Sequence, residues 1–409
     1  MTIRRVFITW QPVLTDHQAF TFQALAYEAG VPVVAYVTTM EDAVRKEQGW
    51  ADTQVSSVER RLIPKRGCLR YCYRQLREHR TDVHVFASPF QQPRLIMSML
   101  FAAWLGIEFY LISEPYSPRA DGYLRENSQL LGKLKAGLRP WLYRVYALLF
   151  RTHTAGIFAI SRMALAQYQQ AGVSPAKLFP FGYFVPCDAA VPALPNSTVL
   201  AVHTDLRIIF VGSLIRRKGV DLLLEAVQRL HAQDCKVSVD IFGPGDVNSI
   251  TPKDASIHYR GMIPFGQAQK VIAQYDLLVL PSRYDGWGVV VNEALCAGVP
   301  VVCSDSTGAG EVAVAFGAGL SFSSGDAHAL GDVLARLVDA PSLLKAMRAA
   351  APLAAHALQP EVAARYMLDV IRAPADRKAS ISSPWYPDRA WLDRLRFGRP
   401  TGCTLPMRL

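Results

Sequence analysis

The sequence predicts an α/β protein of two domains, each built on an open parallel sheet. The chain has 409 residues, which is more than one hydrophobic core usually holds. Short β-rich segments alternate with helical patterns in both halves, as in parallel βαβ units. Hydrophobic residues make up 51% of the chain and charged residues 19%. This composition allows two packed cores and excludes a disordered chain.

The N-terminal half contains five β-rich segments, and the stretch after His17 is expected to be helical. The expected strands are residues 4–9, 31–37, 82–87, 107–112 and 155–160. Prolines crowd residues 173–206 and the periodicity fades there, so we expect the linker between Pro186 and Asp205. We therefore assign residues 1–195 to an N-terminal domain and residues 196–372 to a C-terminal domain. Residues 373–409 remain a tail of unknown role.

The C-terminal half repeats the alternation, and its β-rich runs are apolar on both faces, as buried parallel strands are. The expected strands are residues 206–212, 235–243, 256–261, 276–282 and 299–304, and the expected helices are residues 218–230, 267–274 and 290–298. Open α/β sheets bind ligands at the carboxyl ends of their strands. We therefore expect a ligand site in a cleft between the two domains.

The net charge of +10 is unevenly distributed. Lys and Arg minus Asp and Glu give 22 − 14 = +8 for residues 1–196, 14 − 17 = −3 for residues 197–371, and 8 − 3 = +5 for the rest. The basic half fits an anionic membrane or acceptor as well as a merely solvated surface. Nucleic acid is not an expected partner, because the chain lacks zinc-finger spacing, an RNA-recognition aromatic motif and an arginine-rich tract.

The chain is expected to lie in the cytoplasm, either free or at the inner face of a membrane. No apolar run reaches the roughly 18 residues that a membrane span needs. The segment Leu130–Arg151 mixes Leu, Trp and Tyr with five cations, which suits a helix on a membrane surface and a helix packed on its own domain about equally. Seven scattered cysteines favour free thiols in a reducing compartment over disulfides.

The first motif with chemical content is residues 210–221, a strand that ends at Gly212 and continues through Ser213 into a basic turn. A glycine allows close backbone approach to a ligand. Arg217 and Lys218 stand at the N-terminus of the helix predicted over residues 218–230, where cations oppose the helix dipole at a cost of about 0.3–1 kcal/mol. Two cations in this place favour a bound anion over a solvated helix start.

The second motif is residues 281–302, which reads as strand, glycine-punctuated loop, helix and strand. Gly286 and Gly288 bend the loop, so the amides of Val289 and Val290 could bind a phosphate at the helix start. Carboxylates accept hydrogen bonds from sugar hydroxyls, and this motif carries two. Asp285 precedes the helix and Glu293 lies inside it, so the pair could hold two parts of one ligand. A helix cap at Asp285 and a surface position for Glu293 are the simpler readings.

These residues resemble the retaining family-4 glycosyltransferases of GT-B fold, tightly over residues 206–302 and loosely before. The family's acidic residue, seven others and a glutamate are matched by Asp285 and Glu293, with aspartate in place of the usual first glutamate. The resemblance implies two Rossmann-like domains that face each other across a cleft. It also implies that Asp285 contacts the donor sugar, that Glu293 holds the ribose, and that Arg217 with Lys218 neutralises the leaving diphosphate.

Other likenesses to the family are weaker. Gly243-Pro244-Gly245 resembles the turn before the base pocket, although ordinary turn geometry explains it equally well. Arg260 lies in a segment similar to the strand that lines the base. Ser213 departs from the family, because many members have a second basic residue there, so phosphate binding would depend more on Arg217. The usual glycine pair after the first strand is missing, and so is the usual N-domain histidine. On the acceptor side the candidates are therefore His17 and Glu114, whose simpler readings are a helix-cap neighbour and a solvated carboxylate.

The resemblance implies transfer of a sugar, with retention, from a nucleotide-diphosphate sugar to a glycan or lipid-linked acceptor. No cofactor is expected beyond this co-substrate, and no metal, because no two aspartates are separated by one residue. Two alternatives stay open: a sugar-nucleotide epimerase, and a non-catalytic subunit that binds a sugar nucleotide or glycan. A dinucleotide oxidoreductase is disfavoured, because no Gly-x-Gly-x-x-Gly follows the first strand or the strand that ends at Gly212.

Overall fold

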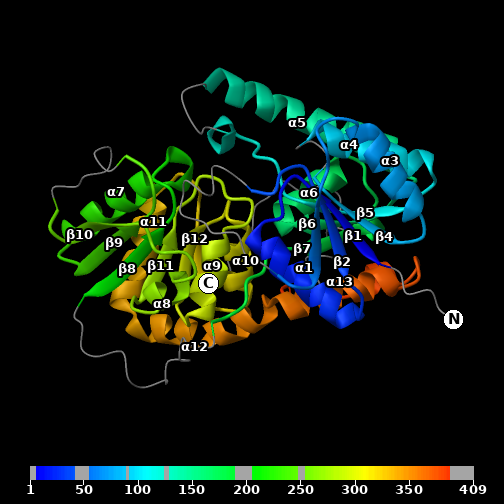
Figure 1. Ribbon diagram of the computed structural model, residues 1–409. Helices are drawn as coiled ribbons and strands as arrows, with labels where there is room; N and C mark the ends of the chain where they lie inside the picture. The colour runs from blue at the N-terminus through cyan, green and yellow to red at the C-terminus, as the bar shows by residue number, and fades with distance from the viewer. Residues whose placement is uncertain are drawn as a thin grey trace.

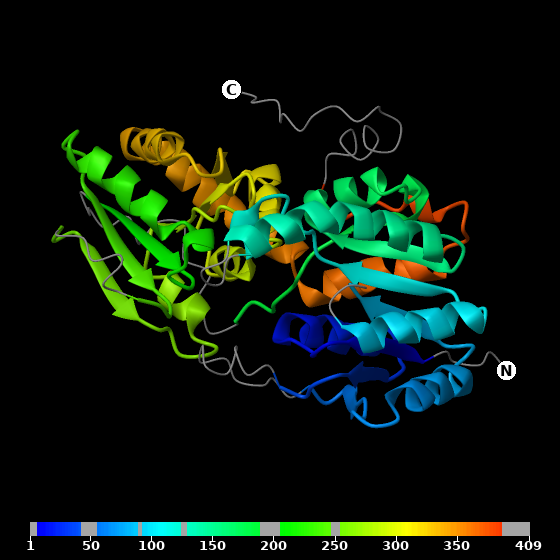
Figure 2. The ribbon, with the colours of Figure 1, turned by 90° about the horizontal axis from the view of Figure 1, so that it is seen from above.

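The structure is a computed structural model that describes residues 6–41, 55–88, 92–123, 129–188, 205–246 and 254–386. It contains two parallel sheets that lie side by side, each with helices on both faces (Figures 1 and 2). The expected α/β architecture of two Rossmann-like sheets is therefore confirmed. The boundary that we expected at residues 195 and 196 lies outside the described residues.

The first sheet has the strand order β3-β2-β1-β4-β5-β6-β7, with all neighbours parallel. Its strands are β1 (Phe7–Gln11), β2 (Val33–Val37), β3 (Val58–Leu62), β4 (Val83–Ala87), β5 (Phe109–Ser113), β6 (Thr154–Ile160) and β7 (Leu178–Phe181). Most of these strands are buried on both faces because helices cover the sheet from both sides. The edge strand β3 has the half-polar sequence VERRL. Because it lacks an apolar run, the sequence pattern did not predict this strand.

The helices of the first domain form two layers. One layer packs on the face that carries Phe7, Ala35 and Val85, and it consists of α1 (Asp16–Ala29) and α13 (Pro360–Arg372). The other layer packs on the face of Ile8 and Trp10, and it consists of α3 (Cys68–Glu78), α4 (Pro93–Trp104), α5 (Gln129–Phe150) and α6 (Ser161–Gln170). The short 3₁₀ helices η1 (Ala120–Tyr123) and η2 (Pro175–Lys177) complete this domain.

The second sheet has the strand order β10-β9-β8-β11-β12-β13, again parallel throughout. Its strands are β8 (Leu206–Val211), β9 (Val237–Phe242), β10 (Ile257–Gly261), β11 (Leu277–Leu280), β12 (Val301–Ser304) and β13 (Gly319–Phe322). One face packs on α7 (Val220–His231) and α11 (Ala327–Asp339), and the other on α8 (Ala268–Ile272), α9 (Val289–Cys296) and α10 (Gly308–Ala315). The 3₁₀ turn η3 (Arg216–Lys218) lies between β8 and α7.

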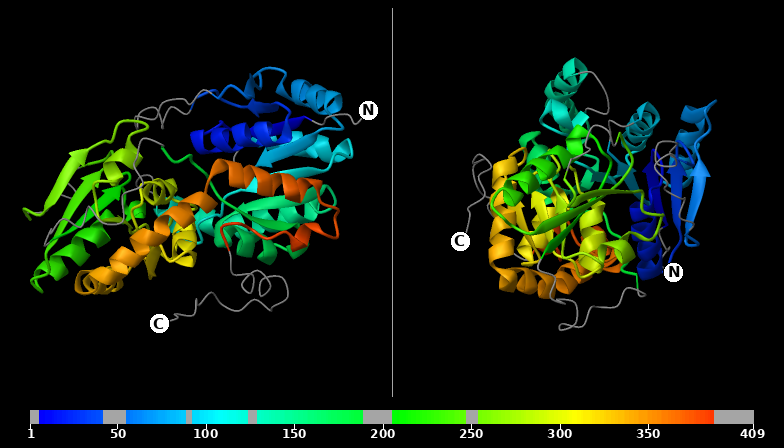
Figure 3. Two further views of the ribbon diagram at one scale, coloured as in Figure 1. Left: turned by 90° about the horizontal axis from the view of Figure 1, so that it is seen from below. Right: turned by 90° about the vertical axis from the view of Figure 1, so that its left-hand side faces the viewer.

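The chain returns to the first domain at its C-terminal end. Helix α12 (Pro341–Ala357) packs on α9, and α13 then lies against α1 on the far side of the molecule (Figure 3). After the short turn η5 (Lys378–Ser380), the fully buried Trp385 packs on Phe181 and Phe184 of the first domain. The described part of the C-terminal tail is therefore docked on the N-terminal sheet.

The expectation of free thiols is wrong for two cysteines. Cys187, just after the last strand of the first sheet, forms a disulfide with Cys296, the last residue of α9. Their separation of 109 residues hides the pair in the sequence, whereas the fold places their Cα atoms 5.0 Å apart. Cys68, Cys72, Cys235 and Cys303 are free. Across the described parts of the chain, no helix combines the length and the apolar character needed to cross a membrane.

Replacing Trp385 with alanine is expected to lower the free energy of unfolding by about 3–5 kcal/mol, because truncation of a buried aromatic leaves a cavity. The Trp385 ring lies 4.9 Å from that of Phe184 and 5.1 Å from that of Tyr366. Urea denaturation would measure the change. Trp104→Ala, at a side chain that is 74% exposed, is the control and should change stability by no more than about 0.5 kcal/mol. Equal losses in the two variants would contradict docking of the tail.

Candidate functional site

Loops from both sheets meet where the carboxyl ends of the strands point toward each other. The hydroxyl of Tyr284, after β11, donates a hydrogen bond of 2.6 Å to the carbonyl of Pro115, after β5. A methyl group built on Gly286 would lie 3.8 Å from Oε2 of Glu114. The boundary between the domains is therefore lined by the loops that the sequence singled out.

The basic turn after Gly212 is held against the β11 loop by its backbone. Gly219 closes the turn at φ +72°, and a methyl group there would lie 2.0 Å from the carbonyl oxygen of Pro281. Only glycine fits this position. The amide of Arg283 donates to the carbonyl of Arg217 over 2.8 Å. Close approach of the two backbones places both basic side chains beside the second motif.

Lys218 and Asp285 form a buried ion pair at the centre of the site. Nζ of Lys218 lies 2.6 Å from Oδ2 of Asp285, whose residue is 8% exposed. Burial opposes ionisation of Asp285, but the charges of Lys218 and Arg217 outweigh it and hold its pKa below the usual value. Arg217 also donates to the carbonyl of Tyr284 over 3.1 Å. The structure thus brings together three residues that we predicted to act as a unit.

The loop that contains Gly286 and Gly288 places the start of α9 beside the ion pair of Lys218 and Asp285. Gly288 has φ +88°, and a methyl group on it would lie 3.0 Å from side-chain atoms of Leu280 and Thr307 and 3.5 Å from Oδ2 of Asp285. Helix α9 begins at the next residue, Val289. The first turn of a helix leaves amide N–H groups without intrahelical acceptors, so Val289 and Val290 present donors beside the ion pair.

Glu293 lies one turn further along α9 and is half-buried. Its carboxylate makes no hydrogen bond or ion pair with any residue that the structure describes. Burial raises its pKa to about 7. A half-buried acid without a partner is costly unless a ligand supplies donors, which agrees with a site for hydroxyl groups.

The two acceptor-side candidates are joined by Tyr183. The ring of His17, at the start of α1, lies 4.0 Å from that of Tyr183, and its Nε2 is 2.9 Å from the hydroxyl of Thr15. The hydroxyl of Tyr183 donates a short hydrogen bond to Oε1 of Glu114. His17 is buried. His17 of α1 and Glu114 of the loop after β5 thus both contact the side chain of Tyr183 on the N-terminal side of the site.

The other residues predicted to bind the nucleotide sugar lie around the ion pair of Lys218 and Asp285, except for Arg260. Gly212 and Ser213 abut the glycine turn after β9, where a methyl group on Gly243 would lie 1.9 Å from the carbonyl oxygen of Gly212. Arg260, on the edge strand β10, is exposed and its Nε donates to Asp240 over 3.0 Å. No hydrogen bond or ion pair joins Arg260 to Lys218 or Asp285.

Residues that couple the domains were missed at the sequence level. Asn292 of α9 donates to the carbonyl of Tyr183 over 2.9 Å and accepts from Nε1 of Trp287 over 3.0 Å. Trp287 packs so closely on Gly182 that a methyl group there would lie 2.3 Å from its ring. Asn292 and Trp287 lie inside the motif at residues 281–302, but no local pattern showed that they would face Tyr183 and Gly182.

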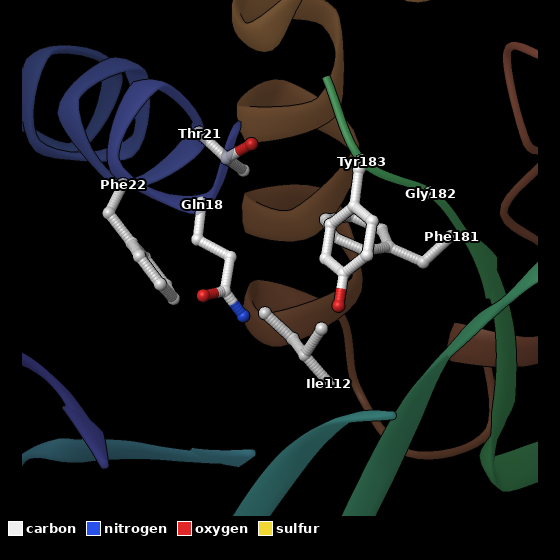
Figure 4. A pocket seen from close by; sticks show the side chains of 7 residues that line it. All are labelled: Gln18, Thr21, Phe22, Ile112, Phe181, Gly182 and Tyr183. Carbon is white, nitrogen blue, oxygen red and sulfur yellow. The ribbon is translucent and has the colours of Figure 1, made fainter. Parts of the chain in front are cut away.

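A small recess lies beside Tyr183 in the N-terminal domain, between α1 and the ends of the strands (Figure 4). Its lining residues are Gln18, Thr21, Phe22, Ile112, Phe181, Gly182 and Tyr183. It has room for about one water molecule, which is too little for a sugar or a nucleotide. The recess is therefore a feature of packing within the N-terminal domain.

Glu293→Gln is expected to stabilise the protein at alkaline pH. The pKa of Glu293 is about 7 in the folded state against 4.5 normally, so between these values the unfolded state binds fewer protons and stability falls as pH rises. Glutamine removes this loss. The variant should therefore exceed the parent by about 1–3 kcal/mol at alkaline pH, and the gain should vanish in acid. Urea denaturation of both proteins, once in acid and once at alkaline pH, would measure this difference in stability.

Glu225→Gln, at an exposed position on α7, is the matched control and should show no such pH-dependent gain. A Glu293→Gln variant whose stability followed that of the parent at every pH would show that burial does not hold this carboxyl in its protonated form.

Comparison with known proteins identifies a family that the chain is similar to and the fold that it shares with solved structures. Residues 198–353 match the family model of glycosyl transferases group 1. The amylovoran biosynthesis glycosyltransferase AmsK of Erwinia amylovora is 30% identical over 150 residues, which are 34% of this chain and 37% of that protein. A GDP-mannose-dependent monoacylated alpha-(1-6)-phosphatidylinositol monomannoside mannosyltransferase of Corynebacterium glutamicum is 30% identical over 149 residues, 34% of this chain and 39% of that one.

Similarity to these curated relatives is partial, whereas structural similarity extends over both domains. The matches cover only 27% to 40% of the relatives' own length. The structure of HepE from Anabaena in complex with UDP-glucose aligns with a TM-score of 0.63 at 13% identity, over 90% of this chain and 99% of that one. WaaG, a glycosyltransferase involved in lipopolysaccharide biosynthesis, aligns with a TM-score of 0.59 at 16% identity, over 90% and 100%.

The predicted resemblance to a glycosyltransferase family is thereby confirmed, while retention and membership of family 4 stay predictions. Residues 198–353 are thus similar to the glycosyl transferases group 1 family, and the two parallel sheets have the GT-B fold.

Proposed function

We propose that the chain is a glycosyltransferase that moves a sugar from a nucleotide-diphosphate donor to a glycan or a lipid-linked acceptor. The observation that carries the proposal is the ion pair of Lys218 and Asp285, flanked by Arg217 and by the start of α9. A diphosphate between these groups would receive charge-assisted hydrogen bonds from the cations and further bonds from helix amides. HepE, whose structure has been solved with UDP-glucose, has the same fold.

The proposed donor lies with its diphosphate at Arg217 and Lys218, its ribose at Glu293 and its sugar at Asp285. In the structure Lys218 contacts Asp285 directly. A bound sugar phosphate would share Lys218 with this carboxylate. Asp285 would then orient the sugar hydroxyls, while the two cations stabilise the charge that develops on the leaving phosphate.

The proposed reaction proceeds with retention, on the front face of the sugar. The bond between C1 and the leaving phosphate oxygen breaks, and the acceptor oxygen forms a bond to C1 from the same side. The proton of the acceptor hydroxyl passes to the leaving phosphate oxygen. Stabilisation of this oxygen is assigned to Arg217, Lys218 and the amides of Val289 and Val290, with no metal taking part.

The proposed acceptor binds on the N-terminal side, where Glu114, Tyr183 and His17 lie together. Two relatives support a glycan or lipid-linked acceptor, since one is named for amylovoran biosynthesis and the other for a phosphatidylinositol mannoside. We place the enzyme in the cytoplasm, at the inner face of a membrane. The disulfide between Cys187 and Cys296 removes the argument for this location that the cysteine count had offered.

Arg217→Ala is expected to lower kcat by roughly 10²–10³-fold with little change in KM for the nucleotide sugar. The reason is that the guanidinium removed by the substitution stabilises mainly the transition state. A thermal-shift screen of nucleotide sugars would choose the donor, and release of nucleoside diphosphate with extracted lipid-linked glycans would measure the rate. Arg216→Ala is the matched control, since Arg216 lies on the same turn but is exposed. A kcat of Arg217→Ala equal to that of the parent would contradict the proposed role of Arg217 in stabilising the leaving phosphate.

Two assays with the nucleotide sugar chosen by this screen distinguish the transferase from an epimerase and from a binding subunit. Incubation of the chosen donor without acceptor should return the sugar unchanged, whereas an epimerase would convert it. Donor binding without transfer to any lipid-linked or glycan acceptor would point to a binding subunit.

Turnover is expected to survive chelation. The proposed stabilisation of the leaving group uses side chains and amides only, so treatment with EDTA followed by gel filtration should leave the rate within about twofold of the untreated enzyme, a negligible change in barrier. Restoration of a lost rate by added Mg²⁺ or Mn²⁺ would contradict the metal-free mechanism.

A further inference from the structure

Helix α5 has two apolar stripes that run along opposite sides. One side is buried in the N-terminal core through Tyr143, Tyr146 and Phe150. The other side carries large apolar residues at intervals of three, four and seven positions, all facing solvent: Leu134 (65% exposed), Leu138 (47%), Trp141 (59%) and Leu148 (67%). This spacing places them on one line along the helix. A helix that only packed on its own domain would need the first stripe alone.

Cations flank the exposed stripe, and acidic residues are absent from the helix. Lys133 and Lys135 lie on either side of Leu134, and Arg144 follows Trp141 by one turn. All three are exposed. No Asp or Glu occurs between residues 129 and 151. The outer face of α5 therefore combines leucine and tryptophan with positive charge only.

Helices α3 and α4 carry further exposed apolar and basic side chains. Helices α3, α4 and α5 lie along the same side of the first sheet (Figures 1 and 2). Trp104 of α4 is 74% exposed and Leu69 of α3 is 45% exposed. Arg70, Arg74 and Arg77 are exposed on α3. This side of the first domain thus carries exposed apolar and basic side chains on three helices, and one exposed acid, Glu78, which lies 3.8 Å from Arg74.

The helix also reaches the proposed site. At Gly132 it passes so close to η1 that a methyl group would lie 2.9 Å from the carbonyl oxygen of Ala120. Helix η1 contacts η3, which carries Arg217 and Lys218. A surface that bound along α5 would therefore lie next to the boundary between the domains, where the acceptor is proposed to enter.

We infer that α5 docks the enzyme on an anionic bilayer, with the stripe Leu134, Leu138, Trp141 and Leu148 in the interface between headgroups and acyl chains. A protein partner would have to supply a row of acids to match the cations, whereas phosphate headgroups supply negative charge along the whole helix. The inference deepens the proposed function and rests on it, because it names the surface that presents a lipid-linked acceptor. Binding to vesicles, however, needs no turnover.

Flotation of the full chain with vesicles tests the inference. The protein should float with vesicles of phosphatidylcholine and phosphatidylglycerol, and much less with phosphatidylcholine alone. Leu138→Gln combined with Trp141→Ala should weaken binding at least tenfold, since both side chains leave the interface. Lys133→Gln and Lys135→Gln should each weaken it by roughly fivefold. Leu353→Gln and Lys345→Gln, at exposed positions of α12, are the matched controls and should bind as the parent does.

Unchanged binding in the Leu138 and Trp141 double variant, or no binding of the parent to either vesicle, would overturn the inference. Sedimentation equilibrium adds a further arm: a dimer that dissociates in the double variant would show that a second copy covers the stripe instead. Thermal shift with the donor should be the same in all these variants. Vesicle binding without transfer to any acceptor would refute only the proposed function.

Discussion

The arrangement of the site depends on the cost of burying Asp285. A carboxylate with so little exposure is stable only beside positive charge, and Lys218 with Arg217 provides it. Both cations come from a turn that must therefore lie against the β11 loop. Gly219 makes this approach possible, because any side chain there would strike the backbone of Pro281. One ion pair thus fixes the relative position of two loops that are 67 residues apart in sequence.

The two domains are coupled by contacts that reach from this site into the core. Tyr284 donates a hydrogen bond to the carbonyl of Pro115, Asn292 donates one to the carbonyl of Tyr183, and Trp287 packs on Gly182. Helix α13 and Trp385 add a second connection on the far side, since they leave the C-terminal domain and pack on the first sheet. The groups proposed to hold the donor and the acceptor are therefore positioned by the same set of interdomain contacts.

Much of the architecture could be predicted from local pattern. Buried parallel strands are apolar on both faces, so β2, β5, β8 and β11 were evident, and the bend at Gly288 followed from the glycines of its loop. The edge strand β3 escaped because its sequence is half polar. The pairing of Lys218 with Asp285 was expected only as proximity to a shared ligand. The link through Tyr183 and the disulfide were out of reach, because both depend on long-range packing that local sequence does not encode.

The disulfide between Cys187 and Cys296 has a mechanical consequence for opening of the site. It ties the exit of the first domain to the end of the helix whose other end forms part of the proposed donor site. With this bond in place, the two domains cannot slide apart at that point. A movement of the domains that opened the proposed site would therefore have to be a rotation about a point near Cys296, in which the loops at Asp285 and Glu114 move apart while the end of α9 stays in place.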